Sequence, residues 1–131
     1  MDIRKAYATN PIAENEGVWV ELGEGAKIKV ARSGNAANRR KLAKLMERHR
    51  AVLRSRNLPE DVLERIMIEV MAETILVGWD GIDEDGQPLP YTVENADRLL
   101  TTYRDFRDQV SAIANDINLF RAESEAEAVK N

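Results

Sequence analysis

Apolar and polar positions alternate with a period of two in the first quarter of the chain. Residues 17–22 and 26–32 both show this alternation, and a Gly-Glu-Gly turn at 23–25 separates them. Alternation on both sides of a glycine-rich turn is typical of a β-hairpin. A lone hairpin is marginal in water, so we expect it to pack on helices or on another chain. Residues 1–16 show no period and are predicted to form a flexible N-terminal arm.

Further along the chain the apolar spacing changes to three and four, which predicts amphipathic helices. The first is a basic helix over residues 35–56, with Lys and Arg on every face except its apolar stripe. The second begins at Pro59, and its apolar arc is wide enough to contact elements on two sides. We expect it to be the central helix and to end at Gly78, because glycine readily caps a helix C-terminus.

A third helical region follows Thr92 and has apolar side chains at alternating spacings of four and three, a heptad seam. The seam consists of Leu99, Tyr103, Phe106, Val110, Ile113, Ile117 and Phe120. A capping box over residues 102–105 favours a short helix followed by a long one. Residues 124–131 are acidic and have few large apolar groups, which predicts a disordered tail.

Together these elements predict a mainly helical α+β fold, with an N-terminal β-hairpin followed by three or four packed helices. The chain of 131 residues suffices for one domain with a modest core, predicted over residues 17–123. It contains no cysteine, which excludes disulfides and thiol chemistry. No uninterrupted apolar run is longer than three residues, the length of 75–77, which is too short to span a membrane, so no membrane contact is predicted and we expect a cytoplasmic protein.

Charge is distributed unevenly along the chain, although the net charge is only −4. Residues 1–56 have a balance of +7, whereas residues 57–131 have a balance of −11. Either the basic half binds nucleic acid, or the two halves attract each other within or between subunits. Overall acidity opposes binding to a polyanion, so we favour the second interpretation and consider nucleic acid an unlikely partner.

No catalytic, metal or cofactor site is predicted, and we expect a protein that is not an enzyme. The acidic loop fails as an EF-hand, because Gly81 and Thr92 would occupy its first and twelfth ligand positions. His49 is the only histidine, which leaves no second ligand of this kind for zinc. The sequence also has no GxSxG, GxGxxG or Walker loop.

Residues 76–92 read LVGWDGIDEDGQPLPYT and give the chain a family resemblance. Gly-Trp and Asp-Gly pairs are common separately, but their ordered combination with the Pro-x-Pro-Tyr-Thr ending is not. This segment, together with the order of hairpin, basic helix, apolar helix and amphipathic helix, resembles the tail assembly chaperones of long-tailed bacteriophages. The broader pattern covers about residues 17–120.

The resemblance implies a non-enzymatic assembly factor in the cytoplasm of a bacterial host. Such chaperones coat the long helical tape measure protein, keep it soluble and help tail tube subunits polymerise around it. They self-associate and are generally absent from the finished virion. The expected partners are therefore the tape measure protein, the tail tube protein and further copies of the same chain.

Several residues are candidates for these contacts. We expect Trp79 and Tyr91 to clamp the loop over residues 78–91 or to contact a partner. The flexible side chains of Met46, Met67 and Met71 offer an adaptable contact surface, although methionines at helical spacing more often belong to a core. We expect Arg39, Arg48 and Arg50 to meet acidic surfaces of a neighbouring subunit.

Two other functions remain open at this stage. The first is nucleic-acid binding through the basic helix, using Arg39, Arg40, Lys41 and Lys44. The second is a structural head-tail or tail component that is retained in the virion.

Overall fold

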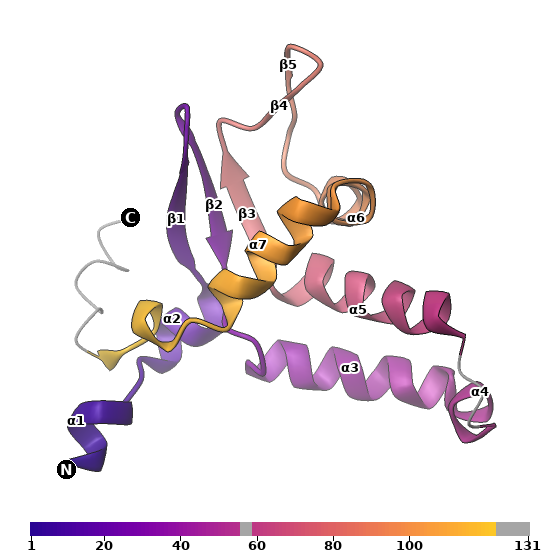
Figure 1. Cartoon of the computed structure of the whole chain (residues 1–131), viewed down its shortest axis with the longest axis horizontal. Helices are drawn as coiled ribbons and strands as arrows, with labels where there is room; N and C mark the ends of the chain where they lie inside the picture. Colours follow the sequence, from indigo (N-terminus) through magenta and orange to yellow (C-terminus); the bar gives the residue numbers. More distant parts are fainter. Residues whose placement is uncertain (56–58, 123–131) are drawn as a thin grey trace.

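The structure is a computed structural model that describes residues 1–55 and 59–122. Its main sheet has three antiparallel strands in the order β1-β2-β3, formed by Val18–Gly23, Ala26–Val30 and Leu76–Asp80. The first two strands are the predicted hairpin. Helices pack against one face of this sheet (Figure 1). The fold is mainly helical α+β, as the sequence predicts.

The third strand corrects the interpretation that extends the central helix to Gly78. Helix α5 (Glu60–Thr74) is followed by strand β3, in which Gly78 pairs with Lys29 and does not cap a helix. Leu76 and Trp79 are buried opposite residues of β2. A short apolar run fits a buried helix or a buried strand equally well, and here the open edge of the hairpin provides the partner for a strand.

Helix α5 is central and makes contacts on two sides, as its wide apolar arc predicts. On one side it packs on α3 (Ala36–Arg48). On the other side it packs with α6 (Val93–Thr102) and α7 (Arg104–Ala114) against the sheet. The buried residues of this main core are Ile28, Val30, Ile68, Ala72, Ile75, Leu76, Trp79, Ala96, Leu99, Leu100, Val110 and Ala114.

Both long helical regions of the sequence are interrupted. The predicted basic helix over residues 35–56 stops at Arg48, because His49 leaves the helical region before the short helix α4 (Arg50–Arg54). The predicted split near residue 102 is confirmed, but the expected short and long helices are nearly equal, with 10 residues in α6 and 11 in α7. Its capping box is wrong, because Tyr103 occupies the N-cap of α7 and makes no side-chain cap hydrogen bond.

The predicted N-terminal arm contains two short helices, α1 (Ile3–Tyr7) and α2 (Pro11–Glu16). Side-chain caps explain why they form without an apolar period: the carboxylate of Asp2 and the amide oxygen of Asn10 accept backbone N–H groups of the first turns. Backbone hydrogen bonds join residues 8–10 to residues 120–122, beside the short 3₁₀ helix η1 (Ile117–Leu119). The predicted disordered tail over residues 124–131 lies outside the described residues.

Candidate partner-binding surface

Trp79 and Tyr91 fix the segment between β3 and α6 from inside. Trp79 is only 8% exposed, and its Nε1 donates a 2.8 Å hydrogen bond to the Leu89 carbonyl. The Tyr91 ring meets the Trp79 ring edge-on, with centroids 5.0 Å apart, and its hydroxyl donates to the Leu76 carbonyl. Burial raises the pKa of the Tyr91 hydroxyl. These contacts hold the loop to the chain's own core.

A second set of contacts holds the small hairpin formed by β4 (Asp83–Glu84) and β5 (Gln87–Pro88). The Glu84 carboxylate accepts two hydrogen bonds from the Arg98 guanidinium, at 2.9 and 2.8 Å, and one from the Tyr103 hydroxyl. The Arg98 hydrogen bonds, and then the Tyr103 bond, lower the pKa of Glu84. No local sequence pattern predicts this network, because Arg98 and Tyr103 lie 14 and 19 positions from Glu84.

The acidic loop does not gather its carboxylates. Among the described residues, no group of three or more His, Asp or Glu side chains is arranged to hold a metal ion. Glu84 turns to Arg98 instead, whereas Asp83 has no ion pair within the described part of the chain.

The basic helix α3 is partly neutralised by α5. Lys41 is 3.0 Å from the Glu73 carboxylate and 3.8 Å from that of Glu69, and Arg48 is also 3.8 Å from Glu69. The oppositely charged halves of the sequence therefore meet within one chain. Arg50 pairs with Glu47 at 3.3 Å.

Three other cations of α3 remain exposed. Arg39, Arg40 and Lys44 form no ion pair with any residue that the structure describes. Of the three arginines predicted to meet a neighbouring subunit, Arg39 is thus unpaired, whereas Arg48 and Arg50 already have partners in their own chain.

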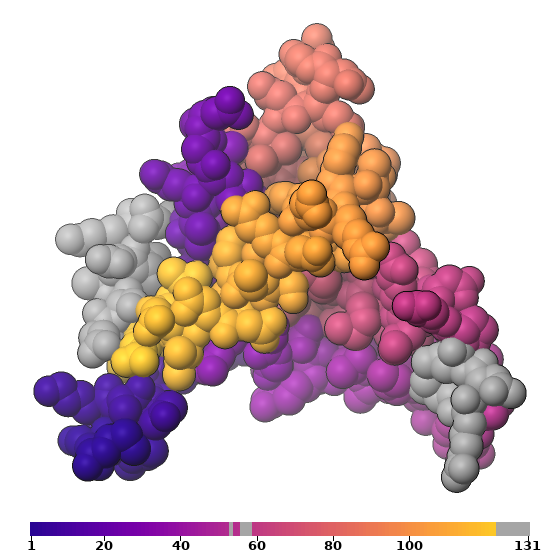
Figure 2. Space-filling model, viewed as in Figure 1, coloured from indigo at the N-terminus to yellow at the C-terminus, as the bar shows by residue number. Residues whose placement is uncertain are grey.

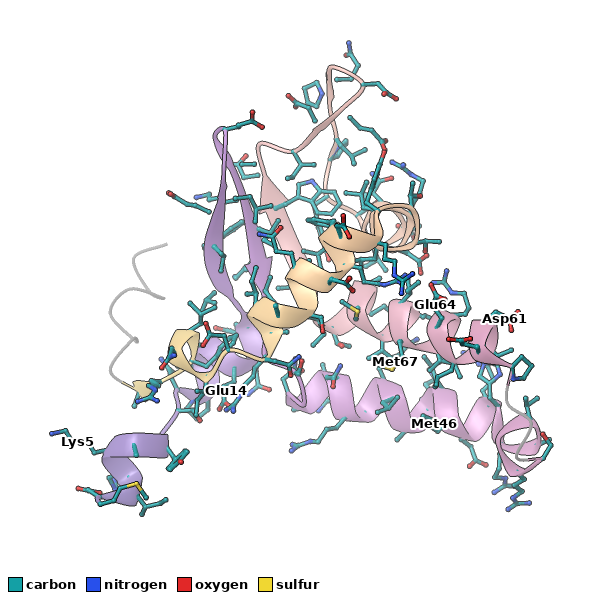
Figure 3. All side chains as sticks on the ribbon, in the orientation of Figure 1. Lys5, Glu14, Met46, Asp61, Glu64 and Met67 are labelled. Carbon is teal, nitrogen blue, oxygen red and sulfur yellow. The ribbon has the colours of Figure 1, made fainter. Side chains whose placement is uncertain are left out.

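The three candidate methionines separate into two environments. Met71 is partly buried and packs against the main core. Met67 is 48% exposed on α5, and Met46 is half-buried on the neighbouring helix α3 (Figure 3). Only Met46 and Met67 are therefore positioned to contribute to an outer surface.

These two methionines belong to an apolar row that we call the α3–α5 strip, made of Leu42, Met46, Leu63 and Met67. Leu63 is 41% exposed and lies one turn from Met67, as Leu42 does from Met46. Successive residues of an α-helix are rotated by about 100° around its axis. This rotation places the strip on one side of the buried α3–α5 contact and the Lys41–Glu69 ion pair on the other side. The helix pair thus has one charged edge and one apolar edge.

Two of the hollows on the other surfaces of the described residues are relevant to binding. A groove of about 780 Å³ between α3, α5 and α6 is lined mainly by charged side chains, among them the paired Arg48 and Glu69 and the paired Arg65 and Asp97. A smaller hollow of about 320 Å³, which we call the apolar pocket, lies where β1, β4, α6 and α7 meet. Its lining residues are Leu22, Ile82, Asp83, Glu84, Leu99, Tyr103 and Phe106.

The comparisons with known proteins identify one family. A family model described as YdaY prophage protein matches residues 33–131, which include every described helix from α3 onward and strand β3. No curated protein and no solved structure matches the chain. None of the described helices is long and apolar enough to cross a membrane.

Proposed function

The chain belongs to the YdaY prophage protein family, and from this premise we propose that it is a tail assembly chaperone. In this role it binds the tape measure protein in the host cytoplasm, keeps it soluble and promotes polymerisation of the tail tube. It performs no catalysis and is absent from the mature virion. The family supports the connection with a phage; the resemblance of residues 76–92 to tail assembly chaperones supports the finer role.

The observation that carries the proposal is the α3–α5 strip. A chaperone for a long helical protein needs an apolar surface that accepts many similar segments in turn. Amphipathic helices dock through apolar side chains at spacings of three and four, and unbranched methionines adapt to partners of different shape. Met67 and Leu63 are 48% and 41% exposed, although both lie on the central helix of the fold.

The supporting surface around the strip is rigid. Buried Leu45, Ile66 and Val70 hold α3 against α5 directly beside the strip, and ion pairs hold the opposite edge. Binding a tape measure helix would therefore cost little ordering of the chaperone's own backbone. The adaptable part is limited to the side chains of the strip.

Co-purification tests this proposal. We would express tagged tape measure protein from the same prophage together with this chain and measure how much of the chain is retained. Replacing Leu63 and Met67 together by Glu should weaken retention by about tenfold or more, equivalent to roughly 1.4 kcal/mol of binding free energy. Equal retention of the wild type and the double variant would contradict binding through the strip.

A control is Val93→Glu, which places one carboxylate on an apolar side chain of similar exposure, 40%, on helix α6. It should leave retention unchanged. Urea unfolding of each variant shows that the fold persists. A loss shared equally by the control would place the contact elsewhere or make it non-specific.

Nucleic-acid binding is the second candidate, favoured by the three unpaired cations Arg39, Arg40 and Lys44. Lys41 contributes less than the sequence suggests, because its side chain is only 15% exposed and pairs with Glu69 and Glu73. A gel shift over a salt series decides, since phosphate contacts weaken steeply with salt. Tight binding at physiological salt that Arg39→Glu with Arg40→Glu abolishes would displace the chaperone proposal.

A structural tail component retained in the particle is the remaining alternative. Mass spectrometry of purified particles separates it from a chaperone. We expect peptides of this chain in the induced lysate and none in the particles, and a stoichiometric amount in the particles would favour the structural role.

A further inference from the structure

Helix α1 presents apolar side chains that the described part of the chain does not cover. Ile3 is 64% exposed and Tyr7 is 57% exposed, and their spacing of four places them on one face of the helix. No residue of α1 is buried. The helix projects from one corner of the molecule (Figure 1). A helix of this length is marginal without tertiary contacts, so a partner surface would stabilise it.

The apolar pocket has the properties of a receptor for such side chains. Its volume of about 320 Å³ lies at the lower end of the range, about 300–1,000 Å³, of pockets that enclose small ligands. It therefore suits one or two side chains and not a whole folded element. Leu22, Leu99 and Phe106 form its apolar wall, and Tyr103, which is 45% exposed, stands at its edge.

The charges beside the two surfaces are opposite. Arg4 and Lys5 lie between Ile3 and Tyr7 on α1, and the only acid adjacent to the helix, Asp2, uses its carboxylate to cap the backbone. At the pocket, Asp83 is exposed and forms no ion pair with any described residue, whereas the neighbouring Glu84 already pairs with Arg98. An α1 helix placed here would have its basic side chains near this acidic rim.

The two surfaces cannot meet within one chain. Helix α1 lies at the lower left corner of the molecule, whereas the segment of β4 and the tip of β1 lie at the top (Figure 2). Lys5 points outward from that corner (Figure 3). An occupant that combines this apolar face with these cations must therefore come from a second copy.

We propose that α1 of one copy inserts Ile3 and Tyr7 into the apolar pocket of a second copy, with Arg4 and Lys5 facing the Asp83 rim. The contact is heterologous, so each copy uses a different surface toward each of its two neighbours. Such contacts continue as filaments or close into rings. This inference rests on the exposed helix and the pocket, and it does not depend on the proposed function.

Cross-linking tests the geometry, because the chain has no natural cysteine. We would introduce Lys5→Cys and Asp83→Cys into one chain, which keeps the inserted side chains of Ile3 and Tyr7, and add a short bis-maleimide reagent. The two positions are too distant to join within a chain, so the expected product is a ladder of dimers, trimers and longer species. Each single variant, Lys5→Cys or Asp83→Cys, gives far less product.

The control pairs Ile12→Cys with Asp83→Cys, because Ile12 is also well exposed, at 60%, but lies on α2. It should give at most a trace of the ladder. A ladder of the same yield from the Ile12 pair, or dimers without higher species from the Lys5 pair, would overturn the head-to-tail contact.

Sedimentation velocity over a concentration series provides the second readout. The wild type should associate, and Ile3→Ser with Tyr7→Ser should raise the dissociation constant by about tenfold or more, whereas Ile12→Ser should not. Circular dichroism shows that each variant is folded. A wild type that stays monomeric at all concentrations, or a double variant that associates as the wild type does, would refute the proposal.

Discussion

Trp79 is the side chain on which the segment between β3 and α6 most depends. Its ring belongs to the main core and meets the Tyr91 ring in a T-shaped contact, and its Nε1 donates to the Leu89 carbonyl. Trp79→Ala should lower the free energy of unfolding by about 3–5 kcal/mol, the usual cost of emptying a large aromatic site. Trp79→Phe keeps most of the packing and loses the hydrogen bond, so it should cost less. Urea melts compare the two; an unchanged midpoint for Trp79→Ala would mean that the ring contributes to binding and not to the core.

Glu84 makes the stability of the β4–β5 hairpin depend on pH. The hydrogen bonds from Arg98 and Tyr103 lower its pKa in the folded chain. A lowered folded pKa contributes stability above the unfolded pKa, and the contribution disappears as pH falls through the folded value. The wild type should therefore exceed Glu84→Gln in stability at neutral pH, and the difference should shrink from about pH 4.3 downward, the ordinary range of a glutamate.

Urea unfolding between pH 7 and pH 3 measures this difference. Asp108→Asn is the control, because Asp108 is exposed on α7 and makes no hydrogen bond or ion pair within the described residues. It should show no comparable loss of stability at neutral pH. A difference between the wild type and Glu84→Gln that stays constant over this range would show that the charge of Glu84 has no role.

Among the turns, Gly81 is where the β3–β4 connection touches the β1–β2 turn. Its φ is +75°, and a Cβ there would collide with the Gly25 carbonyl. Gly86 has a similar φ, +79°, but open space around it. Both Gly→Ala variants incur the left-handed penalty of about 1–2 kcal/mol. Gly81→Ala should cost about 1–3 kcal/mol more from overpacking, measured by thermal or urea unfolding, and equal costs would contradict the close contact of the two turns.

The sequence predicts elements that have a clear period and misses those that depend on a distant partner. The alternation in β1 and β2 and the wide apolar arc of α5 correctly predict a hairpin and a central helix. Strand β3 is missed because only the edge of β2 makes Leu76–Asp80 a strand. The two N-terminal helices are missed because side-chain caps, and not an apolar stripe, define them.

The candidate surface is predictable only in part, for a similar reason. The sequence places Met46, Met67 and Met71 on helices, but their periodicity does not distinguish an outer edge from the core. Contacts with α3 on one side and with the sheet on the other leave Met67 exposed and bury most of Met71. Leu63 lies one turn from Met67 on the same exposed side of α5, and it was not among the residues expected to contact a partner.

Across the molecule, charge is arranged along the long helices and not in separate halves. The basic α3 and the acidic α5 neutralise each other at one edge, which leaves the opposite apolar edge as the surface available to a partner. Of the α3 cations without an ion pair among the described residues, Arg40 and Lys44 lie on the outer face of the helix, whereas Arg39 lies one turn from Leu42, in line with the strip. The separation of a charged edge from an apolar edge on the α3–α5 pair explains how one small protein can expose methionine and leucine side chains and still have a strongly charged surface.

The solubility of the tape measure protein tests this account most directly. We would express the tape measure protein of the same prophage with and without this chain and measure the fraction that stays in the supernatant after centrifugation. The wild-type chain should bring most of the tape measure protein into solution, the Leu63→Glu and Met67→Glu double variant should not, and Val93→Glu should act as the wild type does. An equal soluble fraction with and without the wild-type chain would contradict the proposed chaperone function.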